Sequence, residues 1–283
     1  MKTKLYLALK FIPLVAIALT VWWVLWFMIT GSVMSLEELS GTIGPAITER
    51  EGYSVWPILP TWPTLQPMVA LLLDTPQFFV MFWNTFRLVI PAILGQLLFG
   101  APAAWALSRF RFRGRKILAT VYISLMLLPF QVTMVPNFLV IDRLGLMNNV
   151  FAVILPFAFS AFAVFIMLRG FDAVPRSLLE AASIDGAGHF RTFWQIGLPL
   201  GMPSILAALI LGFLEVWGAI EQPMTFLNDP SNWPLSLFLP QIVAEELGFA
   251  MAASLLMLLP AALFFFFGQK YLELGIQSAG VKE

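Results

Sequence analysis

The chain has 283 residues, of which 60% are hydrophobic and 11% are charged, and its formal net charge is zero. Soluble domains average about 45–50% apolar and about 25% charged residues, so this composition predicts an integral membrane protein. The chain contains no cysteine and a single histidine, His189. These counts exclude disulfides, thiolate metal sites, cysteine nucleophiles and a metal site built from several histidines of this chain.

Six apolar segments are long enough to form membrane-spanning helices, since a helix needs about 20 such residues to cross the hydrocarbon core. They cover roughly residues 11–30, 86–107, 117–136, 150–168, 200–222 and 247–268. The first could be read as a signal peptide, but its apolar run is longer than the about 7–15 residues of that class. We therefore expect an all-α, polytopic integral membrane protein with six transmembrane helices, forming one domain over residues 1–283.

Basic residues predict the orientation of these spans, because cytoplasmic loops are enriched in lysine and arginine. With the N-terminus inside, 13 of the 16 basic residues fall on the cytoplasmic side. These are Lys2, Lys4, Lys10, Arg109, Arg111, Arg113, Arg115, Lys116, Arg169, Arg176, Arg191, Lys270 and Lys282. The outer loops then hold only Arg50 and Arg143, and Arg87 lies near an outer boundary. Both termini are therefore predicted to be cytoplasmic.

The first loop, residues 31–78, is long and is predicted to be extracytoplasmic. It contains Trp56 and Trp62, and tryptophans at such a boundary usually anchor at the headgroup level. Several prolines in the loop forbid one continuous helix. Residues 65–74 have the composition of a short interfacial helix.

The segment 172–199, between the fourth and fifth spans, is polar and is predicted to be a helix followed by a turn on the cytoplasmic side. Pro175 suits the first turn of a helix, where its missing N–H costs nothing. Ser177 and Glu180 have the spacing of a capping box. Gly186 supplies a turn that ends the helix and that would require a positive φ.

The same segment has two interpretations. Small side chains at Ala181 and Ala182 would let a partner approach the helix closely, while Glu180 and Asp185 offer charges to it. Alternatively, the segment is a helical loop that merely connects two spans.

The spelling of this segment favours the first interpretation. Glu180-Ala181-Ala182-Ser183-Ile184-Asp185-Gly186 is followed, nine residues after the glycine, by Ile196-Gly197-Leu198-Pro199. This resembles the EAA coupling loop of importer-type ABC transporter permeases. The segments 110–116, 128–136, 144–149, 268–271 and 279–282 look like carbohydrate-uptake permeases of the maltose/oligosaccharide type. The resemblance runs from about residue 60 to the end and is closer to the second, six-span subunit of that pair.

The resemblance implies a set of partners. Glu180, Ala181, Ala182, Asp185 and Gly186 correspond to the signature that sits in a cleft of the nucleotide-binding subunit. Permeases of this type pair with a second permease subunit and with two ATP-binding cassette subunits, and receive substrate from an extracytoplasmic solute-binding protein. The chain has no glycine-rich phosphate-binding loop. It is therefore expected to bind no cofactor itself, with ATP and Mg bound by the partner ATPase.

Polar residues inside spans are expensive to bury and are candidates for function. Gln131 in the third span and Glu215, Trp217, Glu221 and Gln222 in the fifth are the candidates for the substrate path. Glu215 and Glu221 could instead be partners of polar groups on the companion permease, or gate elements. Trp217 could stack on a sugar or pack against helices. Related permeases have Trp-Asn where this chain has Trp217-Gly218, which puts a direct asparagine contact in doubt.

The predicted function is that of a permease subunit of an ATP-driven ABC importer, moving carbohydrate across a bacterial or archaeal cytoplasmic (inner) membrane by alternating access. The expected surroundings are membrane lipid, with no nucleic acid. An ABC permease for another solute, such as a glycerol-phosphate ester, is one alternative. A membrane-embedded hydrolase that uses Glu215 and Glu221 as paired carboxylates is another. It is disfavoured because both acids fall in one predicted span with no histidine or metal set nearby.

Overall fold

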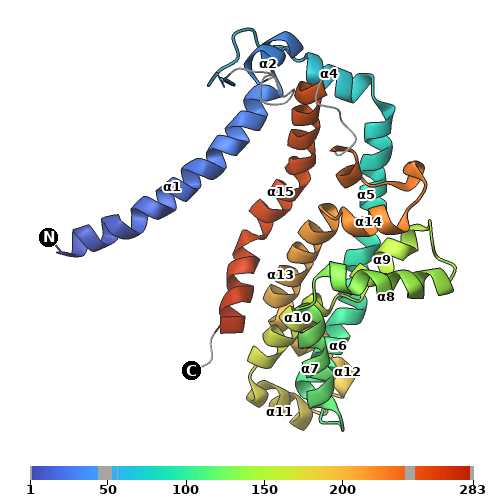
Figure 1. The fold of residues 1–283 in the computed structure, drawn as a ribbon. Coiled ribbons are helices and arrows are strands. Elements are labelled where there is room, and N and C mark those ends of the chain that lie inside the picture. Colours follow the sequence, from blue (N-terminus) through green and yellow to red (C-terminus); the bar gives the residue numbers. More distant parts are fainter. Residues whose placement is uncertain (1, 44–52, 56, 240–245, 281–283) are drawn as a thin grey trace. The chain divides into compact units, whose positions relative to one another are not determined.

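The computed structural model describes residues 2–43, 53–55, 57–239 and 246–280 (Figure 1). Arg50, Trp56 and Lys282, named above, lie outside the described residues. Within the described ranges every regular element is a helix, which confirms the all-α prediction. The α-helices are α1 (Lys2–Gly31), α2 (Leu36–Thr42), α4 (Gln66–Leu73), α5 (Pro76–Gly95), α6 (Ala101–Arg109), α7 (Arg115–Met126), α8 (Phe130–Arg143), α9 (Val150–Ala158), α10 (Ala161–Ala173), α11 (Arg176–Ile184), α12 (His189–Thr192), α13 (Leu198–Trp217), α14 (Glu221–Phe226) and α15 (Leu247–Gly280). The π-helical turns η1 (Gln96–Gly100) and η2 (Phe193–Gly197) and the 3₁₀ turns η3 (Pro230–Asn232) and η4 (Leu235–Leu237) complete the set.

The apolar segments predicted from the sequence form long helical stretches. Among the described residues, five stretches are long and apolar enough to cross a membrane, and α7 with α8 provides a sixth if that bent pair is one span. The five are Phe11–Gly31, Pro76–Arg109, Val150–Ala173, His189–Trp217 and Leu247–Gly275. This pattern supports a polytopic membrane protein.

The third predicted span is not a continuous helix. α7 and α8 meet at an angle of 109°. The break covers Leu127, Leu128 and Pro129, and Pro129 has an extended conformation at the N-cap of α8. A proline disfavours helical conformation at the residue before it and cannot donate an N–H to the preceding turn. The expectation of one helix over 117–136 is corrected accordingly, and α8 continues to Arg143.

Each of the two π-helical turns lies just before a proline. Pro102 follows η1 and Pro199 follows η2, each within the first two positions of the next α-helix. A proline removes one backbone hydrogen bond and crowds the carbonyl four residues earlier, and a widened turn relieves that crowding. The helical stretches can therefore continue through both prolines.

The chain forms two compact units. The first unit comprises Met1–Phe79 and Phe238–Leu259, and the second comprises Val80–Leu237 and Pro260–Glu283. In the first unit, the Ser35 hydroxyl accepts a hydrogen bond from the Glu38 N–H at 3.2 Å and caps α2. The Glu38 carboxylate accepts one from the Thr61 N–H at 2.7 Å, and this bond lowers the pKa of Glu38. The predicted helix over 65–74 is present as α4.

Close helix packing organises the second unit. Its core includes a cluster from α6, α10 and α13 with members such as Trp105, Phe171 and Ile205. A β-carbon added to Gly170 of α10 would lie 2.2 Å from the Ser204 β-carbon of α13. Small residues allow membrane helices to approach closely in this way. The cluster lies directly beside the segment that carries the coupling motif.

Candidate functional site

The predicted helix and turn of segment 172–199 are present as α11 and the residues that follow it. α10 ends at Ala173, and α11 begins at Arg176 after the extended residues Val174 and Pro175. The capping-box prediction for Ser177 is wrong. The N-cap is Pro175, one residue before α11 starts, and it makes no side-chain capping hydrogen bond.

The glycine turn was predicted correctly. Gly186 has φ of +77°, a conformation that side-chain-bearing residues rarely adopt. The Gly186 N–H donates to the Ser183 carbonyl at 3.1 Å, and the Ala187 N–H donates to the Ala182 carbonyl at 2.9 Å. These two bonds form a Schellman motif, which satisfies carbonyls that a helix C-terminus would otherwise leave unpaired. The motif fixes the direction in which the chain leaves α11.

The five motif residues divide between two faces. Glu180, Ala181, Asp185 and Gly186 are exposed. Ala182 is buried, with 8% of its surface exposed, so it faces the protein's own interior.

Large apolar side chains lie beside the exposed motif residues. Ile184 is 86% exposed and Phe190 is 76% exposed. Together with Glu180 and Asp185 they give this end of the second unit a surface that combines carboxylates with apolar groups. An exposed apolar surface flanked by charged groups is typical of a site that binds another protein.

The candidate path residues are brought partly together around an open cavity of about 350 Å³. The cavity is lined by Phe130, Phe157, Glu215, Gly218, Ala219, Ile220, Glu221 and Gln222. Gln131 is adjacent to this set, because its side-chain amide donates a hydrogen bond to the Glu221 carboxylate. The Gln222 side-chain oxygen is buried and has no hydrogen-bond partner among the described residues. The cavity therefore presents hydrogen-bond acceptors.

The predicted single span over 200–222 is wrong in one respect, because the helix that carries Glu215 ends before Glu221. The helical stretch that corresponds to the fifth predicted span begins at His189 rather than residue 200 and ends at Trp217 rather than residue 222. Gly218, Ala219 and Ile220 separate it from α14, where Glu221 and Gln222 lie. The correction matters for the site, since the break lets the two acids line one cavity from different elements.

Trp217 does not line the cavity. It is 3% exposed, and its ring lies 5.2 Å from Phe86 and 5.5 Å from Phe213 between centroids. Aromatic pairs at such separations contribute to packing. These contacts favour a packing role for Trp217 over stacking on a sugar. Phe130 and Phe157, which do line the cavity, were missed because nothing distinguishes them in sequence from the chain's many other core phenylalanines.

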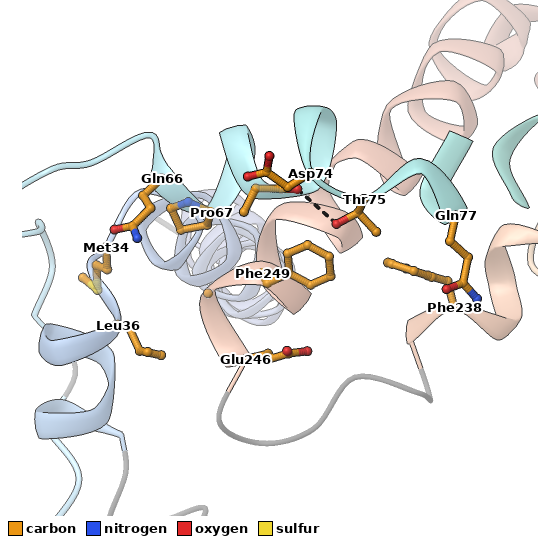
Figure 2. A pocket seen from close by; sticks show the side chains of 12 residues that line it. Met34, Leu36, Gln66, Pro67, Asp74, Thr75, Gln77, Phe238, Glu246 and Phe249 are labelled. Atoms are coloured by element: carbon orange, nitrogen blue, oxygen red, sulfur yellow. Dashed lines mark hydrogen bonds between the residues drawn. The ribbon is translucent and has the colours of Figure 1, made fainter. Parts of the chain in front are cut away.

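A second cavity, of about 530 Å³, lies in the first unit (Figure 2). Figure 2 shows Asp74 and Thr75 from the turn between α4 and α5 and Gln77 from the start of α5, with Glu246 and Phe249 from the region where α15 starts. The Thr75 hydroxyl donates to the Ala70 carbonyl at 3.0 Å. None of the predicted site residues lines this cavity.

Comparisons with known proteins identify the family of this chain. Residues 96–278 match the family described as "Binding-protein-dependent transport system inner membrane component". The arabinooligosaccharides transport system permease protein AraQ of Bacillus subtilis (strain 168) is 30% identical over 208 residues, 72% of this chain and 74% of that protein. The galactooligosaccharides transport system permease protein GanQ of the same organism is 28% identical over 259 residues, 89% of this chain and 92% of that protein.

A solved structure shares the fold. It is a chain of a bacterial ABC transporter involved in the import of the acidic polysaccharide alginate, with a TM-score of 0.80 and 22% identity, covering 95% of this chain and 96% of that one. The family match extends over more than half of the sequence and includes the coupling motif, the α10–α13 packing and the acid-lined cavity. This chain belongs to the family of binding-protein-dependent transport system inner membrane components.

Proposed function

We propose that this chain is a permease subunit of an ATP-driven ABC importer that moves carbohydrate across the cytoplasmic, or inner, membrane by alternating access. The observation that carries the proposal is the exposed, glycine-terminated α11 with the coupling motif, in a chain of this transport family. Because the chain belongs to a transport family, we interpret it as a transporter subunit and not as an enzyme, which argues against the membrane-embedded hydrolase. The names of the relatives favour an oligosaccharide over a glycerol-phosphate ester.

The partners follow from the same proposal. A second permease subunit completes the pathway, and two ATP-binding cassette subunits bind ATP with Mg. They dock at the exposed motif residues Glu180, Ala181, Asp185 and Gly186, while Ala182 packs the motif helix against this chain's own core. An extracytoplasmic solute-binding protein delivers the substrate.

The orientation is part of the proposal. Both termini and the 172–199 coupling loop face the cytoplasm, loop 31–78 faces outward, and residues 1–283 act as one permease domain. The distribution of basic residues supports this orientation, since it is strongly biased to one side.

The cavity between α13 and α14 is the part of the path that we assign to this chain. Glu215, Glu221 and Gln222 offer oxygen acceptors there, and Gln131 holds Glu221 in place. Sugar hydroxyls are donors that such acceptors bind, whereas a carboxylate-bearing sugar would bring further acceptors to a site already lined by acceptors. The cavity therefore favours neutral oligosaccharides.

Changing the cavity acids should weaken transport without dismantling the transporter. Hydrogen bonds to charged groups contribute about 1.5–3 kcal/mol, so Glu215→Gln or Glu221→Gln should raise the apparent KM for uptake by about 10-fold to about 150-fold. Glu273→Gln, an exposed acid of α15 outside the cavity, is the matched control and should transport normally. The measurement is the concentration dependence of uptake, with the yield of assembled complex determined for each variant.

Two results would count against this role. Loss of assembled complex from detergent extracts in both cavity variants would show that the acids hold the permeases together. Unchanged uptake with unchanged yield would remove the cavity from the substrate path.

A further inference from the structure

Both ends of the coupling loop contact the C-terminal half of α6, between Trp105 and Arg109. The Arg109 guanidinium, on the last residue of α6, donates hydrogen bonds to the carbonyls of Phe171 and, at 2.9 Å, Val174. Phe171 lies near the C-terminus of α10, where helix carbonyls lack partners within the helix, and Val174 follows that terminus. The next element along the chain is α11. Arg109 therefore holds the segment through which the chain enters the coupling loop.

A second bond joins the same two helix ends. The Ser108 hydroxyl donates to the Asp172 carboxylate at 2.7 Å. The Arg109 guanidinium also lies over the Trp105 ring, 5.4 Å from its centroid. A guanidinium at this distance is attracted to the aromatic face and is fixed in direction by it. Ser108 and Arg109 thus connect the last turn of α6 to the C-terminal end of α10.

Trp105 also contacts the segment through which the chain leaves the coupling loop. A β-carbon added to Gly197 would lie 2.7 Å from the Trp105 ring, so the backbone at the start of α13 is pressed against this side chain. The Trp105 ring packs edge-on against Phe171, with centroids 5.3 Å apart, and at a tilt against Phe193, with centroids 5.7 Å apart. Leu179 of α11 packs against the same cluster of buried residues. The segment that enters the loop, α11 and the segment that leaves the loop therefore all contact α6 or the buried cluster that contains Trp105.

We infer that Trp105, Ser108 and Arg109, the α6 clasp, are positioning residues that transmit movement of the coupling loop to the membrane-spanning helix Pro76–Arg109. A loop attached only through α10 and α13 could tilt while the second span stayed in place. With the clasp, α6 moves with the loop, because packed interfaces shift as units rather than deform gradually. The inference rests on the proposed function, since it assumes that α11 receives the movement of an ATPase.

The test separates transmission from stability in the complete transporter, purified with its cassette subunits and supplied with its binding protein. Arg109→Met removes both carbonyl bonds, whereas Arg109→Lys keeps a charge but loses the planar fork that reaches two acceptors. Arg113→Met removes an exposed arginine of the following loop and is the matched control. The readouts are complex yield, ATP hydrolysis and the ratio of substrate imported to ATP hydrolysed.

The clasp predicts that Arg109→Met assembles and hydrolyses ATP, while the import-to-hydrolysis ratio falls at least about tenfold. Arg109→Lys should recover part of that ratio, and Arg113→Met should match the unaltered protein. Gly197→Ala, which presses a methyl group against Trp105, should lower the ratio in the same way. An unchanged ratio in Arg109→Met, or loss of assembly in both Arg109 variants, would overturn the inference. Failure of the unaltered transporter to import at all would instead overturn the proposed function.

Discussion

Replacing Glu180 with lysine, or Gly186 with valine, should abolish ATP-driven uptake while leaving the protein inserted in the membrane. Glu180 is exposed on α11, so lysine there reverses a charge on the proposed docking surface without disturbing the core. Breaking one charged pair at a docked interface costs about 2–5 kcal/mol, which weakens docking roughly 30-fold to several thousand-fold. Uptake and binding of the cassette subunit should fall together.

Gly186→Val acts through the backbone. Gly186 has φ of +77°, and a left-handed conformation costs an ordinary residue roughly 1–2 kcal/mol, with β-branched residues the worst accommodated. The Schellman bonds that direct the chain out of α11 should open. Gly188→Ala is the matched control, because Gly188 has φ of −70° and open space around its α-carbon. Normal uptake by both the lysine and the valine variants would show that the coupling motif is a chance sequence similarity with no role in coupling.

Cysteines at two exposed serines should behave oppositely toward a membrane-impermeant thiol reagent in intact cells. Ser183 lies in α11 and Ser54 lies in loop 31–78, and the chain has no native cysteine to confuse the labelling. Because the bias of the basic residues predicts that α11 faces the cytoplasm, Ser183→Cys should be protected and Ser54→Cys should be labelled nearly completely.

Permeabilised cells provide the control for accessibility, since both cysteines should react there. Labelling of Ser183→Cys from outside intact cells would reverse the orientation and detach the coupling motif from any cytoplasmic ATPase.

The features that sequence predicted well depend on local or one-dimensional constraints. Bilayer thickness sets how many apolar residues a span needs, so span positions follow from counting. The turn at Gly186 follows from a backbone conformation that glycine adopts most readily, and its two stabilising bonds lie within six residues. The helix over 65–74 was likewise predicted from composition alone.

The features that sequence missed depend on tertiary contacts. The fifth predicted span ends at Trp217 because the helix breaks at Gly218–Ile220, whereas a count of apolar residues continues across that break to residue 222. The burial of Trp217 results from aromatic neighbours on α5, about 130 residues away in sequence. Arg109 was counted as one basic residue among many, and only its acceptors on Phe171 and Val174 distinguish it.

Uptake into proteoliposomes tests whether this chain is a permease subunit of an ATP-driven carbohydrate importer. The vesicles contain this chain with its companion permease and cassette subunits, and the binding protein with labelled neutral oligosaccharide is added outside. We expect accumulation that requires enclosed ATP with Mg and that stops when Glu180→Lys replaces the unaltered chain. Accumulation that is equal with and without enclosed ATP, or that survives omission of the cassette subunits, would contradict it.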